Sequence, residues 1–222
     1  FKGVREICDT YGVLLILDEV MCGMGRTGHL FACTADDVSP DILCIAKGLG
    51  AGYQPIGAMM CSKDIYDTLG NGSGFFQHGH TYMGHPVACA AGNAVVSAIL
   101  NRGLLNNVHA RSAQLFGALT SKFAQHPHIG DIRGRGLFVG LEFVENRDSK
   151  RPFAPSVKIA ARLKKAAFEA GLICYPMSGT RDGQHGDHLL LAPPFIMTES
   201  ETDELVAKLG DAMRAVTELS DI

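Results

Sequence analysis

The chain has 222 residues, a formal net charge of −3 and 46% hydrophobic residues, which is an ordinary balance for a globular protein. This charge gives no general attraction to nucleic acid or to an anionic membrane, and the longest apolar stretches are far shorter than a membrane span. The seven cysteines are scattered and odd in number, which suits a reducing cytosol better than a disulfide framework. We therefore expect a cytoplasmic protein of one large domain or two small ones.

The first part of the chain alternates a predicted helix with short apolar strands. Residues 1–11 predict a helix that ends at Gly12, because glycine readily takes the left-handed conformation after a helix. Residues 13–17 and 42–46 are continuous apolar runs, typical of buried strands in a parallel sheet. Residues 56–61 predict a further strand.

Two more helices are expected before the middle of the chain. Ser62 can cap a short helix over residues 62–69, and the Asn-Gly-Ser-Gly run at 71–74 predicts a loop. Pro86 opens a longer helix to about residue 100, at the first-turn position where proline is tolerated. Small residues along this helix indicate close packing against another helix or a sheet.

A change of domain is expected soon after this helix. Residues 101–103 break it, and residues 104–125 are helical again. We place the boundary within this second helix, which gives predicted domains at 1–110 and 111–222. The elements predicted for the second domain are strands at 137–144, 172–175 and 188–191 and helices at 156–170 and 198–216. This pattern favours a small α/β domain.

Two local signals refine the second domain. Thr198 and Glu201 predict a capping box at the start of the last helix. The Arg-Gly-Arg-Gly run at 133–136 resembles a phosphate cradle only superficially, because a strand rather than a helix follows it. We therefore expect a turn there.

Asp18 and Lys47 each stand at the end of an apolar run. An amine and a carboxylate delivered in this way match the needs of pyridoxal phosphate, since the amine forms the Schiff base and the carboxylate faces the pyridinium nitrogen. The apolar approach to Lys47 disfavours its charged form, and an uncharged amine is what attacks an aldehyde. Gly48, Gly50 and Gly52 are expected to leave room for a flat ring and a moving lysine.

Taken one at a time, these residues also have plainer interpretations. An aspartate at a strand end is commonly a turn former or a cap, and a lysine before glycine is commonly solvated. The hydroxyl of Thr81 suits a turn as well as a phosphate, and Arg181 suits an exposed loop. The three histidines at 78, 80 and 85 lack a second cluster that would complete four ligands, so we expect no metal site.

Four ordered blocks of sequence carry a resemblance to a known family. Residues 17–32 read LDEVMCGMGRTGHLFA, and residues 46–58 read AKGLGAGYQPIGA. Residues 78–91 read HGHTYMGHPVACAA, and the last block joins GDH at 186–188 to APPF at 192–195. In these blocks and their spacing the chain resembles the class III (omega-type) aminotransferases along essentially its whole length.

The resemblance implies a fold-type-I transferase that depends on pyridoxal phosphate. The chain would supply part of the large domain, with a mainly parallel sheet, and the C-terminal small α/β domain. It begins at Phe1 and is about half the expected length, so the phosphate loop and the ring-stacking aromatic would lie in a part that precedes it. Met21 stands where many members have glutamine, which removes one side-chain hydrogen bond to the cofactor.

The resemblance also implies roles for individual residues. Lys47 would be the catalytic lysine, with Asp18 at the ring nitrogen and Val20 against the ring. Thr81 would reach the phosphate held by the neighbouring subunit of a homodimer with shared sites. Arg181 lies where some relatives place an arginine for the substrate carboxylate.

The implied reaction is transamination through pyridoxamine phosphate. An amino group would pass from an amine or amino acid donor to a 2-oxo acid acceptor. Two alternatives stay open. One is a different reaction on the same scaffold, namely a 1,2-aminomutase or a decarboxylating aminotransferase. The other is an inactive fragment that binds the cofactor without turnover.

Overall fold

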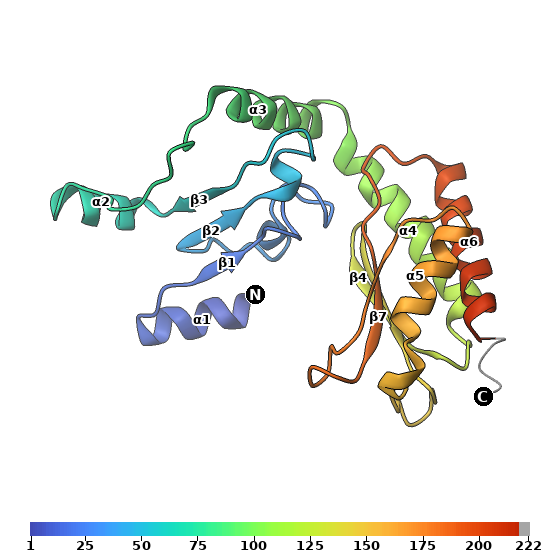
Figure 1. Cartoon of the computed structure of the whole chain (residues 1–222). Coiled ribbons are helices and arrows are strands. Elements are labelled where there is room, and N and C mark those ends of the chain that lie inside the picture. The colour runs from blue at the N-terminus through green and yellow to red at the C-terminus, as the bar shows by residue number, and fades with distance from the viewer. Residues whose placement is uncertain (218–222) are drawn as a thin grey trace. The chain divides into compact units, whose positions relative to one another are not determined.

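The computed structural model describes residues 1–217 and divides into two compact units, Phe1–Leu105 and Asn106–Ile222 (Figure 1). The boundary falls at the start of helix α4 (Leu104–Phe123), the same helix in which the sequence places the change of domain.

The first unit is a three-stranded sheet with helices before and after it. Its elements in chain order are α1 (Lys2–Tyr11), β1 (Ile16–Asp18), the 3-10 helix η1 (Ala32–Asp36), β2 (Ile42–Ile45), the 3-10 helix η2 (Lys47–Leu49), β3 (Ala58–Cys61), α2 (Lys63–Asn71) and α3 (Pro86–Asn101). The strand order is β1-β2-β3. The parallel pairing predicted for β1 and β2 is confirmed, whereas β3 runs antiparallel to β2.

Strand β1 begins later than the sequence predicts, because other partners use the residues before it. The amide of Val13 bonds to the carbonyl of Cys8 at the end of α1. The amide of Leu15 bonds to the Asp41 carboxylate at 2.7 Å. Only from Ile16 onward does the chain join the ladder, with Ile16 opposite Ile42.

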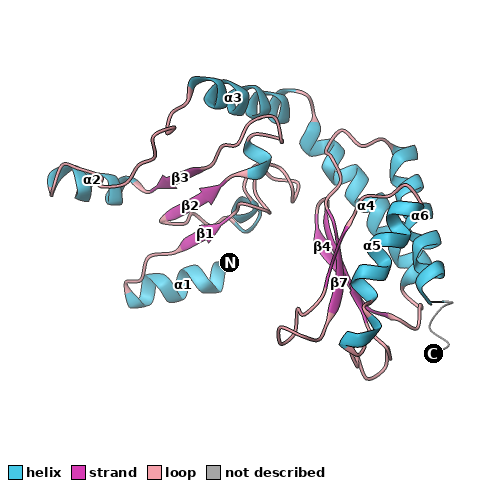
Figure 2. Cartoon of the chain, in the orientation of Figure 1, coloured by secondary structure: helices cyan, strands magenta, loops and turns pink. Residues whose placement is uncertain are grey.

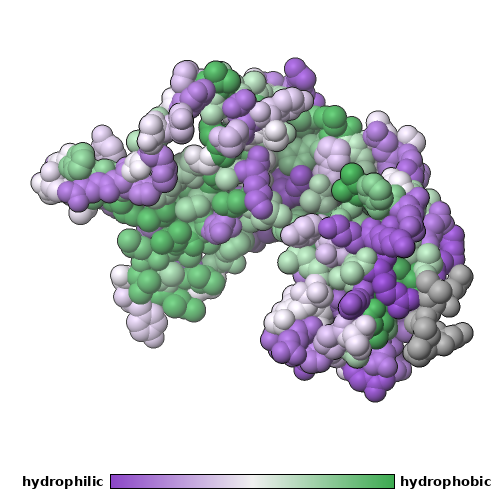
Figure 3. All heavy atoms as spheres, in the orientation of Figure 1, coloured by the Kyte–Doolittle hydropathy of each residue, from purple (hydrophilic) through white to green (hydrophobic). Residues whose placement is uncertain are grey.

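Strands β1 and β2 are buried on one face rather than on both, and β3 is buried on neither. Leu17, Leu43 and Ile45 are buried, but Ile16 is 58% exposed and every residue of β3 is exposed. The space-filling view shows hydrophobic residues gathered on this unit (Figure 3). The expectation of fully buried strands is therefore wrong for this chain taken alone, since only one side of the sheet is covered.

Local signals predict three helix ends of this unit correctly, whereas α2 runs two residues beyond its predicted end, to Asn71. Gly12 ends α1 in the left-handed conformation with φ of 64°. Ser62 caps α2 by accepting a hydrogen bond from the amide of Ile65 at 3.4 Å. Pro86 is the first residue of α3. The close packing predicted from the small residues of this helix is seen at Gly92, where an added Cβ would lie 3.4 Å from Ile56. Helix α3 thus packs closely on the segment that follows β2.

The second unit is a four-stranded antiparallel sheet with helices against one face (Figure 2). Its elements are α4, β4 (Ile129–Arg135), β5 (Phe138–Phe143), the 3-10 helix η3 (Pro155–Val157), α5 (Ile159–Glu169), β6 (Tyr175–Met177), β7 (Asp187–Leu191) and α6 (Glu199–Thr217). The strand order is β4-β5-β7-β6. Alternate residues of β5 point into the core beside fully buried side chains such as Leu115 and Leu209.

Two predictions in this unit need correction. Arg133, Gly134 and Arg135 belong to β4, and the expected turn comes one step later at residues 136–137. The strand predicted at 172–175 begins only at Tyr175, because the amide of Leu172 bonds to the carbonyl of Ala167 and closes helix α5.

The capping box of α6 is confirmed. The amide of Glu201 bonds to the Thr198 hydroxyl at 3.3 Å, and the amide of Thr198 bonds to the Glu201 carboxylate at 2.7 Å. Among the described residues, no single helix is long and apolar enough to cross a membrane; α3 and α4 meet that test only when taken together.

Candidate active site

Asp18 and Lys47 stand at the same edge of the first sheet. Asp18 is the last residue of β1, opposite Cys44 in the neighbouring parallel strand, and Lys47 opens η2 just after β2 ends. The carboxyl ends of adjacent parallel strands meet at one edge, which is where open α/β sheets place their ligand sites. The structure therefore brings an amine and a carboxylate to the position predicted from the sequence.

The carboxylate of Asp18 is oriented by its own turn. Its Oδ1 accepts a hydrogen bond from the amide of Val20 at 3.0 Å, and the side chain is exposed. The turn-forming role of an aspartate at a strand end is thus real here. It is compatible with a functional role, because the hydrogen bond holds the carboxylate at the sheet edge beside Val20, which is half-buried.

Lys47 has a strained backbone and an exposed side chain. Its φ is 41°, in the left-handed region that costs a non-glycine residue energy and is often retained at functional positions. Its Nζ lies 2.8 Å from the Sδ of Met21. The apolar surroundings expected from residues 43–46 are not supplied by this chain, since alternate residues of β2 face inward and Lys47 itself is exposed.

The glycines after Lys47 have a structural use that the sequence reasoning did not foresee. A Cβ on Gly50 would lie 2.2 Å from the carbonyl oxygen of Gln54, and one on Gly48 would lie 3.0 Å from Cβ of Met24. These glycines are required by close backbone packing around η2. Of the three glycines, only Gly52, with φ of 80°, faces open space.

Glu19 is a residue of the site that sequence reasoning missed. It is 1% exposed, and its carboxylate accepts hydrogen bonds from the amides of Ala32 at 2.6 Å and Cys33 at 2.8 Å. Burial, reinforced by Glu19, raises the pKa of the Cys33 thiol to about 11. The carboxylate ties the far end of the glycine-rich loop to the end of β1, next to Asp18. The sequence did hold a signal for a buried role of Glu19, namely an acidic residue inside an apolar and glycine-rich segment.

Thr81 and Arg181 lie on loops. Thr81 is exposed in the turn that precedes α3. Arg181 belongs to the second unit, where it lines a cavity of about 280 Å³ with Lys150 and Glu142. Its amide bonds to the carbonyl of His185 at 2.9 Å. The roles expected for Thr81 and Arg181 stay predictions.

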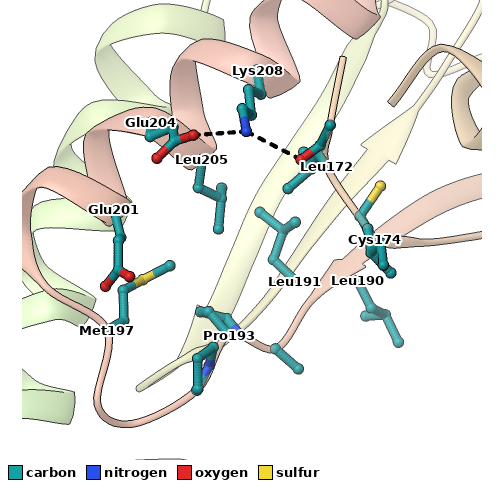
Figure 4. A pocket seen from close by; sticks show the side chains of 14 residues that line it. Leu172, Cys174, Leu190, Leu191, Pro193, Met197, Glu201, Glu204, Leu205 and Lys208 are labelled. Atoms are coloured by element: carbon teal, nitrogen blue, oxygen red, sulfur yellow. Dashed lines mark hydrogen bonds and ion pairs between the residues drawn. The ribbon is translucent and has the colours of Figure 1, made fainter. Parts of the chain in front are cut away.

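A larger cavity of about 350 Å³ lies in the second unit (Figure 4). Leu172, Leu191 and Leu205 give it an apolar wall. Lys208 bonds to Glu204 at 2.7 Å and to the carbonyl of Gly171 at 3.2 Å. Its amine is thus already engaged, so the cavity offers no free reactive amine.

The histidines near Thr81 do not gather into a metal site. The rings of His78 and His80 meet edge to face, with centroids 5.1 Å apart. Over residues 1–217, no group of three or more histidine, cysteine, aspartate or glutamate residues is placed to hold a metal ion.

Comparison with known proteins gives a consistent result. The family model described as "Aminotransferase class-III" matches residues 1–213. An aminotransferase of Gibberella zeae is 43% identical over 96% of this chain and 42% of its own length. A diaminobutyrate–2-oxoglutarate transaminase of Halomonas elongata is 38% identical over 97% of this chain and 45% of its own length. The chain thus spans about half the length of the curated relatives it matches.

Solved structures agree with the sequence relatives. A PLP-bound aminotransferase mutant from Vibrio fluvialis superposes with a TM-score of 0.90 at 34% identity, covering 99% of this chain and 47% of that one. An (S)-enantioselective omega-transaminase from Thermomicrobium roseum superposes with a TM-score of 0.89 at 35% identity, covering 97% of this chain and 46% of that one. The fold is that of pyridoxal-phosphate-dependent transaminases.

Proposed function

The chain belongs to the class III aminotransferases, and from this membership we propose that it carries the catalytic lysine of an enzyme that moves an amino group from an amine or amino acid to a 2-oxo acid. The observation that carries the proposal is the placement of Asp18 and Lys47 at the carboxyl ends of paired parallel strands. We further propose that the chain is the C-terminal half of such an enzyme.

The residues at the sheet edge fit pyridoxal phosphate. Lys47 offers an exposed amine for covalent attachment, and Asp18 offers a carboxylate that a hydrogen bond holds in place. When bound, the cofactor supplies an aldehyde that takes up the amino group and a ring that withdraws electrons from the substrate α-carbon. Lys47 would therefore provide the covalent attachment, and Asp18 would provide the negative charge beside the ring nitrogen.

Each residue has a defined task in this proposal. The carboxylate of Asp18 would keep a proton on the ring nitrogen, because a nearby opposite charge favours the charged form. The Nζ of Lys47 would hold the cofactor and, when free, would move a proton between the substrate α-carbon and the cofactor's aldehyde carbon. Val20 would pack against one face of the ring.

The assembly and the location of the protein are part of the proposal. We propose a homodimer with shared sites, in which Thr81 of one subunit reaches the phosphate bound by the other. The seven cysteines are free of disulfides, which supports a reducing compartment such as the cytosol.

Absorbance of the full-length protein tests the function. With pyridoxal phosphate, the protein should show a visible band that an amino donor bleaches and a 2-oxo acid restores. Lys47→Ala should abolish the band, whereas Lys63→Ala, which changes a lysine with an 81% exposed side chain, should leave it intact. A band that survives Lys47→Ala would overturn the proposal.

The products distinguish the alternative reactions. Transamination consumes donor and acceptor in equal amounts and yields a new oxo compound and a new amino compound. A decarboxylating enzyme would also release carbon dioxide, and an aminomutase would isomerise one amino acid without a separate acceptor. A protein that forms the band but never loses it with any donor would be a binding fragment only.

A further inference from the structure

Met24 and Lys47 both have a left-handed backbone, which is unusual for residues that carry side chains. Met24 has φ of 54° and lies in the turn after β1, and Lys47 has φ of 41° and opens η2 after β2. Such a conformation persists only where the surrounding structure holds it in place, and it is common at functional positions. The contacts that hold these two residues therefore bear on the geometry of the site.

Met24 packs against the residue that directly follows Lys47. It is 2% exposed, and a Cβ built on Gly48 would lie 3.0 Å from its Cβ and 3.7 Å from its Cγ. Two carbon atoms in ordinary contact are about 3.5–4.0 Å apart. Met24 therefore lies directly over Gly48 and leaves room there for a hydrogen atom but not for a methyl group.

The turn that carries Met24 is anchored on both sides of this residue. The amide of Gly23 bonds to the carbonyl of Glu19 at 2.9 Å, and the amide of Gly25 bonds to the carbonyl of Leu30 at 3.1 Å. Glu19 is itself held through its carboxylate by two backbone amides. Met24 is thus a fixed wall against which the start of η2 rests.

The start of η2 is held from its other end by its own hydrogen bonding. The amide of Gly50 bonds to the carbonyl of Lys47 at 3.1 Å, and Gly48 lies between the two. Contact with Met24 therefore restrains the peptide unit that joins Lys47 to Gly48. Because the backbone sets the direction in which a side chain leaves its α-carbon, this restraint also determines where the lysine side chain starts.

We propose that Met24 is a positioning residue for Lys47. By packing on Gly48, it holds the backbone of Lys47 in the left-handed conformation and so directs the lysine side chain to the sheet edge where the cofactor is attached. The inference rests on the proposed function of Lys47 and adds to it. It depends on shape alone and gives Met24 no contact with cofactor or substrate.

Gly48→Ala in the full-length protein tests the contact directly. Gly48 does not have a left-handed φ, so alanine suits its backbone, and the three atoms nearest to the added methyl group all belong to Met24. We expect covalent capture of pyridoxal phosphate by Lys47, followed by its visible band, to slow about tenfold, because misplacing a reacting group is costly. Gly70→Ala, in α2 of the same unit, is the matched control, since its methyl group meets nothing within 4 Å and capture should keep its rate.

Binding of pyridoxamine phosphate separates positioning from general damage. This compound carries an amine in place of the aldehyde, so it binds without a covalent bond to Lys47. We expect Gly48→Ala to keep its dissociation constant within about twofold of the original. A loss of affinity as large as the loss of capture rate would show only a disturbed fold and would overturn the inference.

Two substitutions of Met24 give an independent test, which decides the matter if the thermal midpoint of Gly48→Ala shows that this variant does not fold. Both remove the thioether, but Met24→Ala keeps the Cβ that lies over Gly48, whereas Met24→Gly removes it. Glycine accepts the left-handed conformation without strain, so lower stability would not explain a defect specific to Met24→Gly. We expect Met24→Gly to capture the cofactor about fivefold more slowly than Met24→Ala, and equal rates would overturn the inference.

The outcomes keep this inference apart from the proposed function. If the original protein attaches no pyridoxal phosphate to Lys47, the proposed function fails and the inference falls with it. If the original protein attaches the cofactor and Gly48→Ala does so at the same rate, only the inference is overturned. Slow capture with unchanged affinity for pyridoxamine phosphate, in Gly48→Ala or in Met24→Gly, supports both.

Discussion

Glu19→Ala is expected to loosen the turn that follows β1. The carboxylate is 1% exposed and accepts hydrogen bonds from two backbone amides, those of Ala32 at 2.6 Å and Cys33 at 2.8 Å. Alanine leaves both amides buried without an acceptor. Asp18 is the next residue along the chain, so a loosened turn should also weaken cofactor binding at the sheet edge.

The expected loss of unfolding free energy follows from the two backbone amides that lose their acceptor. A buried donor left unsatisfied costs about 1–3 kcal/mol, so two of them should cost about 2–6 kcal/mol. Glu19→Gln keeps one carbonyl oxygen as an acceptor and should cost about half as much. Glu6→Gln, an exposed glutamate in the same unit, is the matched control and should stay within about 0.5 kcal/mol.

Hydrogen exchange measures the effect where it arises. The amides of Ala32 and Cys33 should exchange much faster in Glu19→Ala than in the original protein, while amides in the second unit should keep their protection. The unfolding free energy of the first unit should fall by the amount given above. Unchanged protection at both amides would refute the assignment of Glu19 as their anchor.

Three further predictions concern the site and one loop. Asp18→Asn should keep the cofactor bound but slow proton abstraction on the order of 10²-fold, and an unchanged single-turnover rate would contradict the role of the carboxylate. Mixing Lys47→Ala with Thr81→Ala subunits should restore about a quarter of the original activity, because half of randomly exchanged dimers then hold one complete site. No recovery despite proven exchange would place Thr81 outside its partner's site. Hydrogen bonding, chiefly from the amide of His185, lowers the pKa of Asp182 to about 2. Since this pKa lies below the ordinary value, the ionised Asp182 carboxylate should help to order the loop near neutral pH, and this contribution should disappear as pH falls from about 4 to 2. A titration of the Asp182 carboxyl by NMR with a midpoint near 4 would contradict this prediction.

Local chemistry made several features predictable from the sequence. Gly12 and Ser62 mark helix ends because each acts on backbone groups only a few residues away. Gly12 does so through its left-handed conformation, and Ser62 through its hydroxyl. The pairing of Thr198 with Glu201 has the same local character. The ends of the two apolar runs were recognisable for a related reason, since an ionisable residue directly after such a run is placed at a strand end.

Features that depend on distant partners were harder to predict. The residues before β1 were predicted as strand, but Leu15 is bound by Asp41, which is 26 residues away in the chain. Leu172 was predicted as strand, but the end of α5 uses its amide. The burial of Glu19 depends on amides 13 and 14 residues further along the chain. No local pattern reveals such contacts.

The surroundings of Lys47 show a further limit of sequence reasoning. An apolar run before the lysine indicated a buried amine, yet burial depends on what covers the strand ends. In this chain the sheet is covered on one face only, and the lysine is exposed. The contact with Met21 could not be inferred either, because it depends on how two turns approach one another.

The identity of the lysine that binds the cofactor tests the central claim most directly. The full-length protein is incubated with pyridoxal phosphate, reduced with borohydride, digested and analysed by tandem mass spectrometry. We predict one phosphopyridoxyl group, located on Lys47, with Lys63 unmodified. A modification on any other lysine, or none under conditions in which the protein is folded, would contradict the assignment of the active site to the ends of β1 and β2.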